Sequence, residues 1–267
     1  MPPSLTTHLL SLTPSHLRTA TTHPFLLAAA TSTLPPSILT TWLAQDRLYA
    51  LSYPSFIGSI LSSLPIPAHP SRSTSLEWRV ADVLIDALAN IRREIGMFEE
   101  VARQEGWEAE VCGGEVEEGT ATRCYRDLFA GATGGAKGWV VGLVVLWATE
   151  ECYLRAWKFA KSHCVAQKGE GDAGQDVMAR VFIPNWSSEE FEGFVGRLRG
   201  LVDEVGVEEG GWVWRECERA WRQVVWIESI FWPDVEGSGQ TVGEEVGGEV
   251  KGQGEIAKEG TKADSVQ

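Results

Sequence analysis

Glu150 is the residue in this sequence whose setting first suggests chemistry. On a helix over Leu143–Trp157, apolar side chains at i, i+3, i+4 and i+7 spacing form one stripe, and Glu150 is its only charge. Its neighbour Glu151 points to another face, where Arg155 follows one turn later, so we expect Glu151 to be ordinary surface. An inward carboxylate must be paired or shift its pKa. Glu150 is therefore a candidate for acid/base work, or for a structural contact with a buried arginine or a backbone donor.

Two further acids repeat this arrangement on other predicted helices. Asp46 lies among aromatic residues in the helical stretch 37–63, and Glu228 does so in the stretch 210–232. The aromatic residues on these two stripes are Trp42, Tyr49, Tyr53, Trp221 and Trp232. One such acid often only joins two helices, but three on the same kind of face indicate a shared polar pocket. Aromatic rings stack on a flat nitrogen-rich ring and carboxylates accept its N–H groups, so the pocket suits such a ligand.

The elements that must position these acids are helices. No stretch shows strand alternation with hairpin turns, and the periodicity of apolar residues predicts about eight helices in an all-α bundle. We expect a loose arm over residues 1–13, a single helical domain over 14–234 and a disordered acidic tail, rich in Gly and Glu, over 235–267. In the helix predicted over 74–105, Glu94 is assigned to the charged outer face.

The composition argues against several classes of partner. The formal net charge of −14 argues against nucleic acid and anionic membrane, which both need a basic face. The five cysteines lie far apart, without C-x-x-C spacing or a histidine cluster, so we expect free thiols and no zinc site. Neither a secretory signal nor an apolar run long enough to span a membrane is visible, which predicts a cytoplasmic protein.

Five segments, in order, resemble the TenA/THI-4 family. They are His23–Phe25, Trp42–Tyr49, Thr122–Phe129, Asn185–Phe191 and Trp226–Trp232, and the resemblance covers roughly residues 15–233. It implies a haem-oxygenase-like helical fold that acts on thiamin-related aminopyrimidines. Relatives on this fold are commonly oligomers, so the resemblance also implies a homodimer or a homotetramer.

The helix around Glu150 departs from the thiaminase II branch of that family. By the position of Trp147, the catalytic cysteine of that branch would fall on Val145 and its tyrosine on Thr149, and neither residue type is present. Cys152 lies two turns too late to take that place. The motif W-A-T-E-E-C-Y, which begins at Trp147, instead resembles the cysteine-lacking TenA_E branch, which includes plant seed-maturation-type proteins.

The TenA_E resemblance implies thiamin salvage by hydrolysis of formyl-aminopyrimidine or aminopyrimidine breakdown products, with no metal or cofactor. Glu150 would activate water or orient the scissile group, and Glu228 would protonate the leaving amine. Asp46 would hold the amino group and ring nitrogen of the pyrimidine. The other expected substrate-binding residues are Tyr49, Tyr125, Tyr153 and Trp186. Because displacement of a thiazolium is hard to assign without the thiol, we expect weak or no thiaminase activity.

Two other functions stay open at this stage. With the cysteine absent, the same scaffold could bind a heterocycle without converting it. A haem- or oxygen-handling protein would need a proximal histidine in the first helix, where His16 and His23 lie. A histidine that precedes a proline at a helix boundary, as His23 does, is more often structural.

Overall fold

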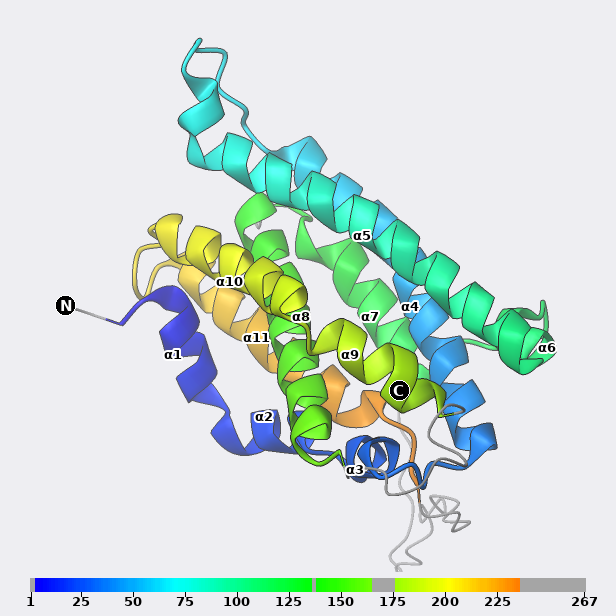
Figure 1. The fold of residues 1–267 in the computed structure, drawn as a ribbon. Helices are drawn as coiled ribbons and strands as arrows, with labels where there is room; N and C mark the ends of the chain where they lie inside the picture. The colour runs from blue at the N-terminus through cyan, green and yellow to red at the C-terminus, as the bar shows by residue number, and fades with distance from the viewer. Residues whose placement is uncertain (1–2, 136–137, 165–175, 236–267) are drawn as a thin grey trace, which may run out of the picture. The chain divides into compact units, whose positions relative to one another are not determined.

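The chain folds into helices. The computed structural model describes residues 3–135, 138–164 and 176–235, and this part of the chain contains no strand (Figure 1), which confirms the all-α prediction. The helices are α1 (Leu5–Leu12), α2 (Pro14–Thr21), α3 (Pro24–Ala30), α4 (Pro36–Ser63), α5 (Leu76–Glu105), α6 (Glu108–Cys112), α7 (Thr120–Ala132), α8 (Gly138–Ser162), α9 (Ile183–Trp186), α10 (Glu189–Glu204) and α11 (Trp212–Phe231). A 3-10 turn, η1 (Arg72–Thr74), precedes α5, and a π-helical turn, η2 (Met178–Phe182), precedes α9.

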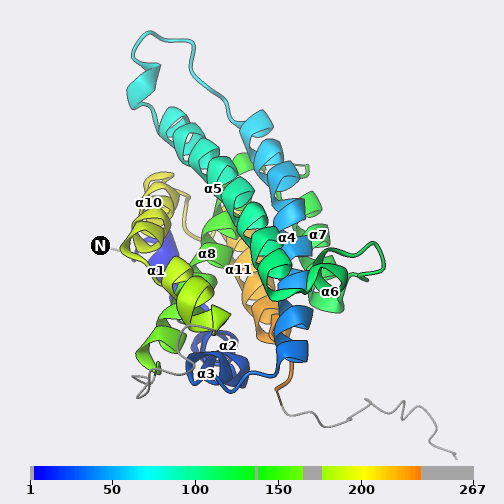
Figure 2. The ribbon, with the colours of Figure 1, turned by 45° about the vertical axis from the view of Figure 1, so that its right-hand side comes forward.

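The long helices α4 and α5 lie side by side (Figures 1 and 2). The hydroxyl of Ser75 accepts a hydrogen bond from the backbone N–H of Trp78 at 3.2 Å and so caps the start of α5. Gly106 ends α5 at φ 75°, a left-handed conformation that a glycine adopts without strain. Pro54 lies within α4 at an exposed position, and the helix continues through it.

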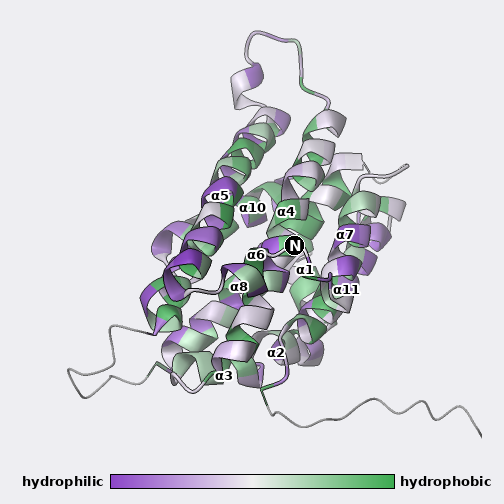
Figure 3. Ribbon diagram, turned by 90° about the vertical axis from the view of Figure 1, so that its right-hand side faces the viewer, coloured by the Kyte–Doolittle hydropathy of each residue, from purple (hydrophilic) through white to green (hydrophobic). Residues whose placement is uncertain are grey.

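Helix α8 is the centre of the bundle. It contacts α2, α3, α4, α7, α9, α10 and α11, and every residue from Val141 to Thr149 is buried. Gly142 permits a close approach, because an added Cβ would lie 2.8 Å from Cγ1 of Ile60 on α4 and 2.9 Å from Cγ2 of Thr133. On the outer helices α5 and α7, hydrophilic and hydrophobic residues alternate along the helix (Figure 3).

Buried tryptophans fill much of the core. Trp42 on α4 contacts the rings of Phe25, Trp157 and Trp186 at centroid distances of 5.5, 5.6 and 6.1 Å. Trp147, further toward the start of α8, stacks on Trp221 of α11 at 5.4 Å. These contacts join helices that lie far apart in the sequence, which explains why the aromatic residues recur at helical spacing.

The expected loose arm over residues 1–13 is wrong. Residues 5–12 form α1, whose Leu5 and Leu9 are buried against the domain. The backbone N–H and the hydroxyl of Thr6 donate to the carboxylate of Asp203 at 2.8 and 2.9 Å. The arm is therefore fixed by both apolar burial and hydrogen bonds. The compact unit that contains it ends at Val235, and the predicted tail lies outside the described residues from position 236 onward.

Candidate active site

One pocket contains every residue that was expected to be catalytic or to bind the substrate. Helices α4, α5, α7, α8, α9 and α11 surround it, and the space between its side chains, part of it open to solvent, is about 440 Å³. The seven expected residues that line it are Asp46, Tyr49, Tyr125, Glu150, Tyr153, Trp186 and Glu228. The cavity itself is about 30 Å³, so a bound ring requires the lining side chains to move apart.

The two glutamates that were expected to be catalytic each accept a hydrogen bond from a tyrosine. The hydroxyl of Tyr53 donates to Oε1 of Glu150, and the hydroxyl of Tyr125 donates to Oε1 of Glu228. The other oxygen of Glu228, Oε2, is buried and has no partner among the described residues. A buried carboxylate oxygen without a donor is costly, so this atom is suited to receive a hydrogen bond from a ligand.

Burial raises the pKa of both glutamates. The pKa of Glu228 rises to about 7, because desolvation outweighs the hydrogen bond from Tyr125. The pKa of Glu150 rises to about 8, chiefly through desolvation and also through the charges of Glu94, Glu228 and Asp46, against the hydrogen bond from Tyr53. Both groups therefore exchange protons near neutral pH, as acid/base catalysis requires.

Asp46 lies deep in the same pocket. Only 3% of its surface is exposed, and its Oδ2 accepts a hydrogen bond from the hydroxyl of Tyr153 at 2.8 Å. Burial raises its pKa well above the usual value, and the charges of Glu94 and Glu228 add to that rise.

The walls of the pocket are aromatic. The ring of Tyr49 meets those of Tyr125 at 4.9 Å and Phe231 at 6.1 Å, both edge to face. The ring of Tyr153 meets that of Trp186 at 5.2 Å, also edge to face. These rings line the pocket with faces and edges on which a flat ring can stack.

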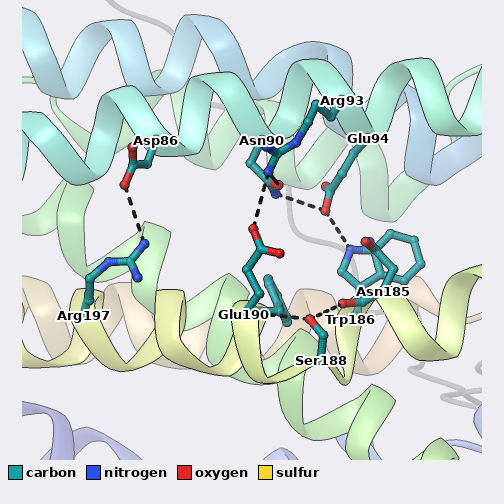
Figure 4. Close-up of polar contacts among 10 residues, drawn as sticks. Asp86, Asn90, Arg93, Glu94, Asn185, Trp186, Ser188, Glu190 and Arg197 are labelled. Atoms are coloured by element: carbon teal, nitrogen blue, oxygen red, sulfur yellow. Dashed lines mark hydrogen bonds and ion pairs between the residues drawn. The ribbon is translucent and has the colours of Figure 1, made fainter.

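Sequence reasoning missed two polar residues of this site. Glu94 was assigned to the outer face of its helix, but it lines the pocket and its Oε1 accepts hydrogen bonds from Trp186 Nε1 at 3.0 Å and Asn90 Nδ2 at 3.2 Å (Figure 4). Its spacing could have revealed it, because it lies three residues after Ile91 and four before Phe98, both buried. Tyr53 was placed on the stripe of Asp46, but no role was expected for it.

The expected environment of Glu151 is wrong. The ion pair with Arg155 is present at 2.7 Å, but Glu151 is only 2% exposed and also pairs with Arg199 of α10 at 2.7 Å. Helix α10 packs on this face of α8, so a side chain that would be surface on an isolated helix becomes buried. Glu151 therefore joins two helices and takes no part in the pocket.

The position matched to the family's cysteine by way of Trp147 does not face the pocket. Val145 is fully buried and does not line the pocket, whereas Thr149, one turn later, does. Cys152 is fully buried as well and is not among the lining residues. The residues of α8 that face the pocket are Thr149, Glu150 and Tyr153.

The histidines considered for haem lie outside this pocket. His16 is exposed on α2, and His23 caps α3, where its ring accepts a hydrogen bond from the backbone N–H of Phe25 at 3.2 Å. Within the described residues, no group of three or more His, Cys, Asp or Glu side chains is arranged to hold a metal ion. None of the described helices is both long and apolar enough to cross a membrane.

Two curated proteins are similar to this chain in sequence, although no family model matches it. One, from Fusarium pseudograminearum, carries the name "Probable transcription factor". It is 27% identical over 268 residues, which cover 88% of this chain and 53% of that protein, so the chain spans about half of its length. The other, from Glycine max, is named "Probable bifunctional TENA-E protein" and is 23% identical over 184 residues, 69% of this chain and 72% of that protein.

Solved structures of TenA proteins share the fold. A TenA homologue from Pyrococcus furiosus superposes with a TM-score of 0.68 at 20% identity, covering 85% of this chain and 98% of that one. A TenA family transcription regulator from a Silicibacter species gives a TM-score of 0.68 at 13% identity, covering 85% and 94%. With the similarity to the soybean protein, these likenesses confirm the resemblance predicted from the sequence motifs.

Proposed function

We propose that this protein is an enzyme of thiamin salvage that hydrolyses C–N bonds of aminopyrimidines. The TenA fold and the sequence similarity to a TENA-E protein support this proposal. The observation that carries the proposal is the pairing of Glu150 and Glu228 in one aromatic pocket, with one oxygen of Glu228 unpartnered. Both carboxyls have a pKa near neutrality, which is the range in which one can hold a proton while the other accepts one.

In this proposal the pyrimidine ring lies between the aromatic walls. Asp46 accepts hydrogen bonds from the exocyclic amino group and from a protonated ring nitrogen, a role that suits its deep burial. Tyr49 and Tyr125 contact the ring, and Trp186 closes the pocket beside Tyr153.

The carboxyl pair supplies the proton transfers. For the formyl-aminopyrimidine, one carboxylate takes a proton from water, whose oxygen adds to the formyl carbon. The other carboxyl gives its proton to the nitrogen as the C–N bond breaks, which releases the amine and formic acid. For the aminopyrimidine, water replaces the protonated amine at the methylene carbon, which yields the hydroxymethyl compound and ammonium. In both cases the water proton and the donated proton balance, so the pair returns to its starting charge.

The pKa values concern the pair as a whole. Burial raises the pKa of Glu150 to about 8 and that of Glu228 to about 7, so near neutral pH the two carboxyls together hold about one proton. One carboxyl can then act as the acid while the other acts as the base.

The test is the hydrolysis of N-formyl-aminomethylpyrimidine and aminomethylpyrimidine by the wild type, Glu150→Gln and Glu228→Gln, followed by mass spectrometry of the products. We expect both variants to lose at least about 100-fold in kcat, as removal of an acid/base group usually costs. The exposed Glu209→Gln serves as the control and should match the wild type. Variants that match the wild type would contradict the assignment of the two glutamates. If the wild type binds the pyrimidine without converting it, the protein is a heterocycle-binding protein and the hydrolase is refuted.

We also propose a homodimer or homotetramer in the cytoplasm as the working form. Light scattering of the purified protein measures the first point, and imaging of a tagged full-length chain measures the second. A monomeric mass at working concentration would contradict the assembly.

A further inference from the structure

Glu94 is a fourth carboxylate in the pocket, and the proton transfers proposed above do not use it. Its hydrogen-bond donors are the neutral side chains of Trp186, Asn90 and Asn185. Within the described part of the chain, no Arg, Lys or His lies within ion-pair distance of it; the neighbouring Arg93 donates to Oδ1 of Asn90 at 2.8 Å and pairs with Glu190 at 3.8 Å (Figure 4).

No cation is among the described residues that line the pocket, and the charge of Arg93, outside it, is the weakest of the influences that lower the pKa of Glu94. The acids that line the pocket are Asp46, Glu94, Glu150 and Glu228. Glu228 is 4% exposed and its Oε2 has no donor, which is independent evidence that this space receives a ligand. Acids in a low-dielectric cavity repel each other, so a ligand that brings a positive charge is favoured over a neutral one of the same shape.

Glu94 lies where the pocket meets a second groove, from which a polar side arm of a ligand can reach the pocket. Besides the pocket, it lines a broad groove between α5 and α10, whose other polar residues include Asn90, Arg93, Asn185 and Ser188. Figure 4 shows Glu94 beside Trp186 at the end of this groove. Its charge raises the pKa of both Asp46 and Glu150, so it lies electrostatically close to the ring-binding acid and to a catalytic acid.

We propose that Glu94 is a specificity-determining residue. It binds the protonated amine of the substrate's aminomethyl group, at the end of the pocket that meets the groove. The pocket would thereby select cationic aminomethylpyrimidines over neutral pyrimidines with the same ring. This inference rests on the proposed function for the ring and the site, but it concerns binding and is measured without turnover.

The experiment compares two ligands that differ in charge and little in size: aminomethylpyrimidine, cationic at pH 7, and hydroxymethylpyrimidine, neutral in its side arm. Their affinities are measured by calorimetry for the wild type, Glu94→Gln and the control Asp82→Asn. Gln keeps the size of the side chain and an oxygen that can accept from Trp186, and Asp82 is an exposed acid on the same helix. Binding is read at 10 °C to slow any turnover of the amine, and product formation is checked in parallel.

We expect Glu94→Gln to bind the amine about 10-fold more weakly and the alcohol within twofold of the wild type. Asp82→Asn should leave both affinities unchanged. An equal loss for both ligands would show that Glu94 only supports Trp186 and would overturn the proposal, as would an unchanged affinity for the amine. If Glu94→Gln weakens only the binding of the amine, but the wild type turns over neither the aminopyrimidine nor its formyl derivative, this inference is supported and the hydrolase is refuted. If the wild type binds neither ligand, both proposals are refuted.

Discussion

The hydroxyl of Tyr125 donates to one oxygen of Glu228, and the other oxygen of the same buried carboxylate has no donor. The bond from the tyrosine holds the pKa of Glu228 below the value that burial alone would give, although it remains raised at about 7. One residue of α7 thus tunes the proton affinity of a residue of α11, while the unpartnered oxygen is left for chemistry.

This relationship predicts the pH dependence of hydrolysis. The rate should rise through pH 7 as Glu228 loses its proton and fall through pH 8 as Glu150 loses its own, which gives a bell-shaped profile. Tyr125→Phe removes the hydrogen bond that lowers the pKa of Glu228, so the rising limb should move to higher pH. Initial rates of wild type and variant from pH 5 to 10 measure both effects. A profile that is flat between pH 6 and 9 would contradict the carboxyl pair.

The same burial predicts a cost in stability at high pH. The pKa of Glu228 is about 7 when folded against 4.5 as its ordinary value, so the folded state binds the proton more tightly. The stability that results is fully present below about pH 4.5 and is lost as the pH rises through 7. Glu228→Gln should therefore gain up to roughly 3 kcal/mol relative to the wild type between pH 4.5 and pH 9, at about 1.36 kcal/mol per unit. Urea unfolding at both pH values measures it, with Glu209→Gln as the control that should follow the wild type.

The aromatic core predicts a large effect for one tryptophan and a small one for another. Trp42 has no exposed surface and contacts the rings of Phe25, Trp157 and Trp186, so Trp42→Ala should lower the free energy of unfolding by roughly 3–5 kcal/mol. Trp226 is 49% exposed, and Trp226→Ala should cost less than about 1 kcal/mol. Chemical unfolding followed by circular dichroism measures both. Equal losses in the two variants would mean that Trp42 does not pack as described.

The pocket-facing side of α8 predicts the response to thiamin. No cysteine is among the described residues that line the pocket, so the wild type should release little or no thiazole from thiamin. Thr149→Cys places a thiol on the pocket side of α8, and a bound aminopyrimidine should protect it from a small thiol reagent. Val145→Cys is the matched control, because its thiol lies in the core and should resist the reagent with or without ligand. Robust release of thiazole by the wild type would refute the expectation.

Much of the site could be predicted because helical periodicity alone indicates which residues share a face. Asp46, Glu150 and Glu228 were each the lone acid on an apolar stripe, and the fold brings all three stripes to one pocket. The stripe of a helix does not depend on its partners, so this information is present in the local sequence.

What could not be predicted depends on which element covers which face. Glu151 is buried because α10 packs over it, a contact between segments some 50 residues apart that no local pattern reveals. Glu94 was hidden among charged neighbours on α5, and only the indole of Trp186 from another helix turns it into part of the pocket. The position of Val145 was inferred by alignment on Trp147, which fixes neither the rotation of α8 nor the side that faces the cavity.

The position of α8, and with it the position of two pocket residues, depends on Gly142, which has no side chain. Its missing Cβ lets α8 rest directly against Ile60 and Thr133, and Thr149 and Glu150 follow about two turns later, roughly 11 Å along the same rigid rod. A methyl group at position 142 would clash with Ile60 and Thr133, tilt α8 and displace Thr149 and Glu150 together. A substitution at position 142 would thus alter substrate fit without changing the identity of any residue that lines the pocket.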